Sequence, residues 1–432
     1  MRNFFSLVPF FIFLATFIGL NIYYPLADPG IKSDFPLLAI FIALLFSLFT
    51  FKNKTTLNDK IKVFIKGAAQ ESILHLCFVF LFSTMLSYTA NRIGASQAAV
   101  DIVLYSLPEN FILPGIFLFS SLFSVFLGTS MGTILTLMPI FLQIGQSLVI
   151  NPQFIAGIVI SGAMFGDNIS LISDTTIAAT NVTGSTMLDK LKDNLRTALP
   201  AAITVLIILT YMNHHYVAIK PLTFLPQISI VNFFKISPYL ITLVLALLGF
   251  DVLCELVAGI LLAIGIGLYY QQFTFLDVTE LFHYGFYKSK GMVVIFMLVL
   301  FLSGLSQIVK HNGGITFLLN ALGKQSKSLF RTKLEIFFLV FFVNAAVAIN
   351  SLSILIVGPL ASKLAENKLS FARTASILDI GSCVSQGILP YTPQVLAAAT
   401  ICNISPISIM PFLFYPYLLL GALLIDISIQ KR

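Results

Sequence analysis

Two aspartates seven residues apart, Asp167 and Asp174, lie inside a long apolar region of the sequence. The segment from Gly162 to Gly184 reads GAMFGDNISLISDTTIAATNVTG, and strongly apolar residues flank it on both sides. Placing one Asp at the centre of a membrane helix costs about 2.5–3.5 kcal/mol, even on the lenient insertion scale. Two of them, beside a run of hydroxyl side chains, therefore need a compensating role.

The residue types around these aspartates fit a small cation. Carboxylate, amide and hydroxyl oxygens, with backbone carbonyls freed by an unwound helix, are the ligands that a hard ion such as Na⁺ requires. The candidate binding residues of this segment are Asp167, Asn168, Ser170, Ser173, Asp174, Thr175 and Thr176. We place the Na⁺ site at the two aspartates. The structural alternative is an interfacial loop in which the aspartates only cap short helices.

A second polar string, DIGSCVSQGILPYTPQ, runs from Asp379 to Gln394. Its glycines and prolines predict another broken helix. Ser385 and Gln386 are its candidate binding residues. The string has no acid aligned with Asp167 or Asp174, so we expect the formal charge of the two polar strings to lie in the first half.

Small polar residues also interrupt two apolar stretches, 111–142 and 334–362, at Gly128–Thr133 and Asn350–Ser353. Their arms have roughly 12–16 residues, which is too short to span a bilayer and suits re-entrant hairpins. The candidate binding residues at these tips are Thr129, Ser130, Asn350 and Ser351. Two long tilted helices with small packing residues are the alternative.

The rest of the chain must position these residues inside a membrane. Of the 432 residues, 58% are hydrophobic and 10% are charged, against about 25% charged in soluble domains. A span needs about 20 apolar helical residues. The candidate spans are about 4–24, 35–51, 71–90, 153–183, 198–212, 237–250, 253–270, 291–309, 374–401 and 408–426. We therefore expect an all-α polytopic membrane protein with about ten spans plus two hairpins.

The net charge of +7 predicts an orientation in the membrane and no nucleic-acid partner, because the basic residues lie in short predicted loops. They are Lys52, Lys54, Lys60, Lys62 and Lys66 in the loop 52–70, Lys190, Lys192 and Arg196 in the loop 184–197, then Lys310, Lys324, Lys327, Arg331, Lys333, Lys363, Lys368, Arg373, Lys431 and Arg432. All lie on one side if the chain has ten spans and each interrupted stretch enters and leaves on one face. That topology places both termini in the cytoplasm, in a bacterial-type inner membrane. We expect Glu71 and His75 to form an interfacial pair, and Asp251 and Glu255 to lie in a solvated loop.

Two parts of the sequence resemble each other at an offset of 220 residues. Ser130–Pro139 corresponds to Asn350–Pro359, and Ala178-Ala179-Thr180 corresponds to Ala398-Ala399-Thr400. Five predicted spans separate the two interrupted stretches, and an odd number inverts the second unit. Inverted repeats with discontinuous helices are typical of secondary transporters. The predicted organisation is scaffold spans in 1–110, a first transport repeat in 111–212, linking spans in 213–333 and a second transport repeat in 334–432.

Motifs for other functions are absent from the sequence. No GxxxxGK[ST] is present to bind ATP as a P-loop does, so the energy source must be an ion gradient or a partner subunit. No HExxH, GxGD or GxSG string supports a membrane-embedded enzyme. We expect no enzymatic activity and no cofactor. A channel is a further alternative. It is less favoured because a channel does not need the inverted repeats that a transporter uses to open alternately to each side.

The string GDNISLISDTT, with GTSMGT before it and NSLSILIVGP and LDIGSCVSQGILPYTPQ in the second half, resembles the NhaC-type sodium/proton antiporter family. The resemblance covers about 110–200 and 335–415. It implies the fold of the ion transporter superfamily, with inverted repeats, re-entrant hairpins and broken helices, and it implies a homodimer with an elevator-like motion. The family's acidic motif would fall on Asp167 and Asp174. Met131 and Asn350-Ser351 depart from the family's usual Trp and double Asn, which bears on the substrate.

These observations predict a secondary active transporter. The first hypothesis is exchange of Na⁺ for H⁺, in which one carboxylate binds Na⁺ when ionised and a proton when Na⁺ leaves. The second hypothesis is Na⁺- or H⁺-coupled transport of an amino acid or a small organic acid. In that case the carboxylates would hold the coupling ion, and the amides and hydroxyls of the second half would contact the solute.

Overall fold

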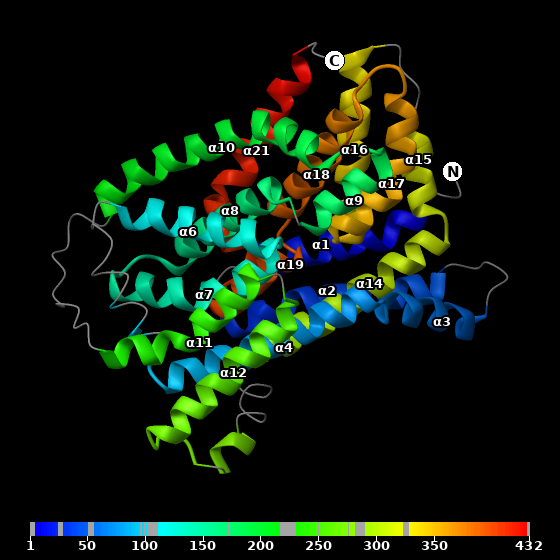
Figure 1. Cartoon of the computed structure of the whole chain (residues 1–432). Coiled ribbons are helices and arrows are strands. Elements are labelled where there is room, and N and C mark those ends of the chain that lie inside the picture. Colours follow the sequence, from blue (N-terminus) through cyan, green and yellow to red (C-terminus); the bar gives the residue numbers. More distant parts are fainter. Residues whose placement is uncertain are drawn as a thin grey trace.

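The computed structural model describes the backbone of residues 5–24, 29–50, 56–95, 97–98, 101, 111–171, 173–216, 230–248, 250–274, 276–280, 290–322 and 328–429. Helices make up most of this part of the chain, and no strand occurs in it (Figure 1). They are η1 (Phe5–Leu7), α1 (Val8–Tyr23), α2 (Pro29–Thr50), α3 (Leu57–Ala68), α4 (Glu71–Arg92), α6 (Ile112–Leu127), α7 (Ser130–Ser147), α8 (Pro152–Ile169), α9 (Asp174–Thr183), α10 (Met187–Tyr216), α11 (Ile230–Leu247), α12 (Val252–Tyr269), α14 (Lys290–His311), α15 (Gly314–Leu322), α16 (Leu329–Val347), α17 (Asn350–Ala365), α18 (Phe371–Ile388), α19 (Pro393–Ile401), α20 (Pro406–Ile409), η3 (Met410–Phe412) and α21 (Phe414–Ser428).

Several of these helices can cross a membrane by length and composition. Within the described ranges, four pass both criteria, namely Ile73–Arg92, Pro152–Thr183, Met187–His214 and Val252–Tyr269. The bent pair Phe371–Ile401 with Pro406–Phe412 makes a possible fifth, and six shorter apolar helices accompany them. In a helix, the backbone N–H and C=O groups hydrogen-bond to one another. The bilayer core requires this because it has no water to satisfy them. The prediction of an all-α polytopic membrane protein is confirmed.

Helices end at both places where small polar residues interrupt apolar stretches. α6 ends at Leu127, and its C-cap Gly128 has a φ of 67°, a left-handed conformation that glycine adopts without strain. α16 ends at Val347, where Ala348 has a φ of 57°. After each break the chain extends for a residue, and α7 or α17 begins. The two helix pairs therefore turn at residues that the sequence analysis singles out.

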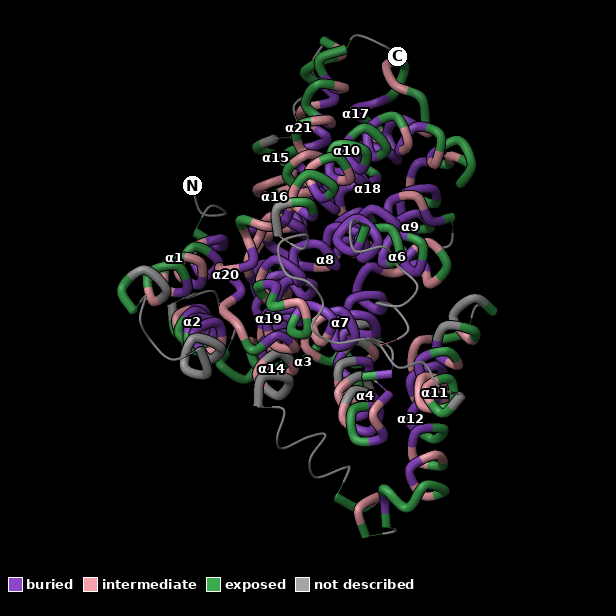
Figure 2. Tube along the Cα trace, turned by 90° about the vertical axis from the view of Figure 1, so that its left-hand side faces the viewer, coloured by how far each residue is buried: buried purple, intermediate pink, exposed green. Residues whose placement is uncertain are grey.

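The two polar strings also interrupt their helices. α8 ends at Ile169 and α9 begins at Asp174, while α18 ends at Ile388 and α19 begins at Pro393. α8 packs against α6 and α7, and α18 packs against α16 and α17. Much of α8 and α18 is buried in the middle of the molecule, whereas outer helices such as α10 and α12 expose one side (Figure 2). Because surrounding helices cover the interrupted ones, the protein can supply partners for their freed backbone groups.

Two predicted loops are helical instead. Residues 57–68 of the predicted loop 52–70 form α3, which the Thr56–Asp59 capping box starts. The predicted loop 184–197 is wrong from residue 187 onward, because α10 begins at Met187 and continues to Tyr216. Helix propensity is high for the Leu and Lys residues of this segment, so its charged residues are compatible with a helix.

Three basic residues that the sequence places in solvent-facing loops are buried, which corrects that prediction. Lys190 lies 2.5 Å from Asp379, the Lys333 ammonium donates to the Ile429 carbonyl at 2.9 Å, and Arg373 pairs with Asp426. Such side chains are rarely buried unless they are paired. Of the other basic residues, Lys52, Lys54, Lys324, Lys327, Lys431 and Arg432 lie outside the described residues.

Of the acidic pair at the start of α12, Asp251 is exposed as predicted, whereas Glu255 is buried, which corrects the prediction for that residue. Asp251 is the N-cap of α12, and its carboxylate accepts from the Leu253 backbone N–H at 2.8 Å. Glu255 lies one turn further along and is buried, with 3% of its surface exposed. Glu255 lies in the first turn of α12, on the side that neighbouring helices cover.

Candidate functional site

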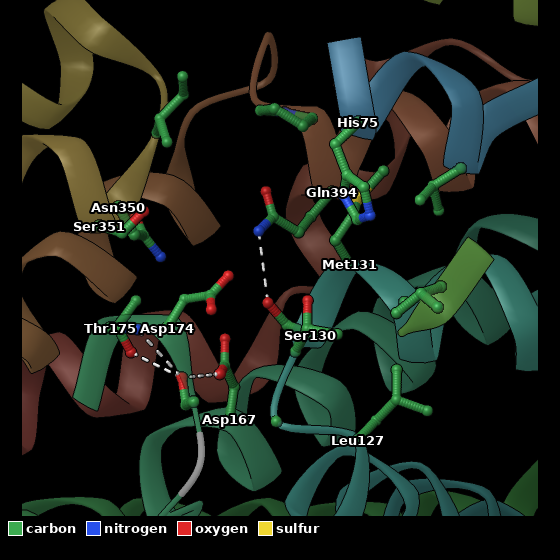
Figure 3. Close-up of a pocket in the computed structure, with 18 of the residues that line it drawn as sticks. His75, Leu127, Ser130, Met131, Asp167, Asp174, Thr175, Asn350, Ser351 and Gln394 are labelled. Carbon is green, nitrogen blue, oxygen red and sulfur yellow. Dashed lines mark hydrogen bonds between the residues drawn. The ribbon is translucent and has the colours of Figure 1, made fainter. Parts of the chain in front are cut away.

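A cavity of about 790 Å³ lies where the interrupted helices meet (Figure 3). Its wall includes both tips, Gly128–Gly132 and Ala348–Ser351, as well as residues that follow the ends of α8 and α18. Nine of the thirteen binding residues predicted from the sequence line it, namely Thr129, Ser130, Asp167, Ser173, Asp174, Thr175, Asn350, Ser351 and Gln386. The fold thus gathers residues that are more than 200 positions apart in the sequence.

Asp167 is the buried carboxylate of this cavity, with 7% of its surface exposed. The Ser173 hydroxyl donates to Asp167 Oδ1 at 2.5 Å, and Ser173 is also the N-cap of α9. Ser130, the first residue of α7, lines the same cavity near this carboxylate (Figure 3). Asp167 is therefore oriented by the residue that starts the next helix, α9.

Asp174 is the first residue of α9 and is exposed toward the cavity. Figure 3 shows its carboxylate and that of Asp167 directed into the same open space. An acid at this position also interacts favourably with the positive end of the helix. The position of Asp174 therefore fits both a helix-capping acid and an ion ligand. Asp167 differs from it because its carboxylate is buried.

The second half contributes amide side chains to the wall. The side-chain oxygens of Asn350, Gln386 and Gln394 are buried and have no hydrogen-bond partner among the residues that the structure describes. The Gln386 amide donates to the Ala348 carbonyl at 3.4 Å, and the Gln394 amide donates to Ser130 Oγ at 3.3 Å. Buried polar atoms without partners are uncommon in native proteins. These oxygens are therefore available to a ligand.

The charge of the cavity wall is one-sided. Four carboxylates line it, those of Glu71, Asp167, Asp174 and Asp251, and no Lys or Arg occurs among the lining residues that the structure describes. His75 Nε2 lies 3.1 Å from Asp251 at the more exposed end. A concave wall with one sign of charge raises the local concentration of the opposite ion, so this cavity attracts cations.

The partner that the structure gives His75 is Asp251, and not Glu71 as expected from the sequence. His75 of α4 joins Asp251 of α12, and all three residues line the cavity. Sequence spacing could show only that Glu71 and His75 share a helix face. The contact with α12 depends on packing between segments 176 residues apart.

Four predicted binding residues do not line the cavity and instead hold the broken helices in place. The Asn168 amide donates to the Tyr415 hydroxyl at 2.9 Å, and Ser170 Oγ donates to the Val125 carbonyl at 2.8 Å. Thr176 Oγ1 donates to the Ser170 carbonyl at 2.8 Å. Ser385 Oγ donates to the Phe341 carbonyl at 2.9 Å. In this structure their polar groups are engaged within the protein.

The sequence does not predict the buried ion pair of Lys190 with Asp379, or that Glu71, His75 and Asp251 line the cavity. Gln394 is a polar residue of the second string but is not among the predicted binding residues. Its proximity to Gln386 was a usable signal. The described residues hold no group of three or more His, Cys, Asp or Glu side chains arranged for a metal ion. The cavity offers separate carboxylate, hydroxyl and amide oxygens, which suit a weakly held cation that must also leave.

Comparison with known proteins agrees with this chemistry. The Na⁺/H⁺ antiporter family model matches residues 31–214 and 215–429. The malate-2H⁺/Na⁺-lactate antiporter of Bacillus subtilis (strain 168) is 24% identical over 362 residues, which cover 77% of this chain and 76% of that protein. The Na⁺/H⁺ antiporter NhaC of Alkalihalophilus pseudofirmus is 39% identical over 87 residues, covering 20% and 19%. The chain is therefore a secondary transporter that belongs to the Na⁺/H⁺ antiporter family, as the resemblance to NhaC-type proteins predicted.

Proposed function

We propose that this chain exchanges Na⁺ for H⁺ at a site formed by Asp167 and Asp174. The observation that carries the proposal is the charge of the cavity, which has four carboxylates and no Lys or Arg among its described lining residues. This charge attracts a cation and repels an organic anion. The transported ions would be Na⁺ and H⁺, with no cofactor.

The position of Asp167 suggests how the two ions compete. A buried carboxylate is costly unless a cation or a proton compensates its charge. When Na⁺ leaves, a proton is therefore the most available replacement. Two ionised carboxylates in one cavity repel each other when no Na⁺ is bound, so this state is disfavoured. The two carboxylates then take up protons as a coupled pair. Na⁺ and H⁺ would thus bind in alternation, which is the requirement for exchange.

We further infer that residues 111–212 and 334–432 form two inverted transport repeats. Support comes from the matching breaks, where α6 and α16 each end at a left-handed residue and α8 and α18 each stop before a short helix. Two facing helix pairs of this kind suit re-entrant hairpins around a central site. Residues 1–110 and 213–333 would then be scaffold, in a homodimer whose termini are both cytoplasmic in a bacterial-type inner membrane.

A second candidate function is coupled transport of a small organic acid. Two observations favour it: the cavity of about 790 Å³ is far larger than one ion needs, and three buried amide oxygens face no partner. Pockets of about 300–1,000 Å³ are typical for small molecules. The Bacillus subtilis relative is named for malate and lactate. Against this candidate stands the lack of a basic group in the described wall to hold a carboxylate.

Proton movement in inside-out vesicles distinguishes the two candidates. A pH gradient is imposed, and its dissipation is followed after addition of NaCl, LiCl or KCl, and of NaCl with malate or lactate. Na⁺/H⁺ exchange predicts dissipation by Na⁺ alone that the Asp167→Asn variant loses. Dissipation only when malate or lactate accompanies Na⁺ would instead establish the organic-acid candidate. No response to any of these additions, with correctly inserted protein, would contradict both.

A further inference from the structure

A buried ion pair lies outside the cavity, between the two broken helices. Lys190 Nζ in the first turn of α10 is 2.5 Å from Asp379 Oδ2 of α18, and 1% of each side chain is exposed. A lysine at the start of a helix faces the positive end of the helix dipole, and burial of its charge adds a further cost. Neither helix propensity nor solvation accounts for Lys190, so its contacts must.

Those contacts lead to the gap between α8 and α9. Besides Asp379, Lys190 donates to Thr176 Oγ1 at 2.7 Å, and the Thr176 hydroxyl in turn donates to the Ser170 carbonyl at 2.8 Å. Ser170 is the C-cap of α8, and the last carbonyls of a helix have no partner within it. One end of the ion pair therefore reaches the interrupted backbone beside Asp167.

Asn194, one turn after Lys190, makes a parallel connection. Its amide nitrogen lies 2.7 Å from the Asn168 carbonyl and 2.7 Å from Asp379 Oδ2. Asn168 directly follows Asp167 in the chain. The Lys190–Asp379–Asn194 cluster thus links the end of α8, the start of α9 and the middle of α18, although none of its three residues lines the cavity.

The cluster is not arranged for stability alone. Asp379 Oδ1 and Asn194 Oδ1 are both buried, and neither has a hydrogen-bond partner within the described part of the chain. A partly satisfied network is less stable than an apolar core of the same shape. We propose that Lys190, Asp379 and Asn194 are positioning residues that fix the α8–α9 gap, and with it the Asp167 carboxylate, relative to α18. This inference rests on the proposed exchange of Na⁺ at Asp167.

Neutralising both members of the ion pair tests the inference. The variants are Lys190→Met, Asp379→Asn and the two combined. Each single change leaves one buried charge unpaired, so we expect a lower melting temperature in detergent and less folded protein. The double variant leaves no unpaired charge, and its melting temperature should return toward that of the wild type. Lys192→Met is the matched control, because the Lys192 side chain on the same helix is 75% exposed.

The decisive measurement is the Na⁺ dependence of proton movement, normalised to folded protein in the vesicles. We expect the double variant to raise the apparent KM for Na⁺ by roughly 10-fold or more, as loss of an outer-shell partner does at metal sites, while Lys192→Met matches the wild type. A stable double variant with a wild-type KM would overturn the inference and leave exchange intact. Single variants as stable and active as the wild type would also overturn it. A wild type without Na⁺-driven proton movement would refute the proposed function, and the inference with it.

Discussion

Asp167 and Gln386 occupy matching positions near the ends of α8 and α18. Each lies two residues before the last residue of its helix, and each lines the cavity. Six residues later, the N-cap of the next helix turns back, so that Ser173 donates to the Asp167 carboxylate at 2.5 Å and Thr392 donates to the Gln386 carbonyl at 2.7 Å. The Ser173 hydroxyl thus holds the Asp167 side chain, whereas the Thr392 hydroxyl holds the backbone carbonyl of Gln386. The two matching positions therefore carry a carboxylate in the first half and an amide in the second.

This difference makes Asp167 the residue on which exchange should depend. Asp167→Asn keeps the shape of the side chain but removes its charge and its ability to carry a proton. We expect Na⁺-dependent proton movement to fall to the background of empty vesicles. Asp189→Asn is the control, because that acid is exposed in the first turn of α10, where its carboxylate accepts from the Thr186 hydroxyl at 2.7 Å. Normal exchange in Asp167→Asn would remove this residue from the site.

Asp174 should contribute less than Asp167. It is exposed at the start of α9, where solvent and salt screen its charge. An interaction of about 1 kcal/mol corresponds to roughly a 5-fold change in affinity. We therefore expect Asp174→Asn to raise the apparent KM for Na⁺ by about that factor, more at low than at high ionic strength, with the maximal rate largely kept. A complete loss of exchange would instead make Asp174 an equal partner of Asp167.

The amide oxygen of Gln386 offers a separate test of the second half. It is buried in the cavity wall without a partner, whereas the nitrogen donates to Ala348. Gln386→Leu removes that oxygen, so we expect a rise of about 10-fold in the apparent KM for Na⁺ if it is a ligand, from the loss of roughly 1–1.5 kcal/mol. Gln153→Leu is the control, because its oxygen is also buried without a partner but lies outside the cavity. Equal effects of both changes would indicate a stability effect only.

The sequence predicts much of the fold because the bilayer restricts the choices. Apolar runs of helical length mark most of the helices, and the breaks are visible because Gly, Pro and polar residues are conspicuous within such runs. The tips at Gly128 and Asn350 and the gap after Asp167 follow from this contrast. Both aspartates and the Gln386 amide therefore enter the list of candidate residues before their proximity is known.

The features that the sequence does not predict depend on contacts between distant segments. A basic residue counts toward membrane orientation by its position in the chain, and nothing local shows that Lys190 turns inward to meet Asp379, 189 residues later. The same holds for His75 and Asp251, which only the packing of α4 against α12 brings together. The burial of Glu255 was missed for the same reason, because its position near the start of a predicted span does not show which helices cover its side chain.

A pH prediction concerns Asp277, which lies outside the candidate spans. Hydrogen bonds from the Thr274 hydroxyl and backbone N–H, and then the Arg92 guanidinium at 3.0 Å, lower the pKa of Asp277 from 3.8 to about 2. A lowered pKa in the folded state means that the stabilisation is complete above about pH 3.8 and is lost as the pH falls toward 2. This contact joins the end of α4 to the segment after α12.

The measurement compares the wild type with Asp277→Asn in detergent. We expect the wild type to melt at a higher temperature by an amount that is constant between pH 8 and about pH 5, and that shrinks as the pH falls through about 3.8 toward 2. Asp59→Asn is a useful comparison, because Asp59 also has a lowered pKa, through hydrogen bonds from Thr56. A difference for Asp277→Asn that already changes between pH 8 and pH 6 would show that another group controls this contact.

Close packing of α8 on α6 should be as important for exchange as the charged residues. A Cβ atom at Gly162 would lie 2.5 Å from the Phe117 carbonyl oxygen and 2.8 Å from Ser120 Cβ. The neighbouring Ser124 hydroxyl donates to the Ala163 carbonyl at 2.6 Å, so the two backbones are held together at this point. α6 leads into the Gly128 tip and α8 carries Asp167, and a shift between them would therefore separate two walls of the cavity.

Gly162→Ala tests this packing directly. Forcing a methyl group into a filled interior costs typically about 1–3 kcal/mol, so we expect a lower melting temperature and a reduced exchange rate per folded molecule. Gly421→Ala in α21 is the matched control, because no atom lies within 4 Å of its added Cβ and Ala favours a helix over Gly by about 1 kcal/mol. That variant should be at least as stable as the wild type. If Gly162→Ala kept both its melting temperature and its exchange rate, α6 and α8 would have to separate easily, and the fixed position of Asp167 could not depend on their contact.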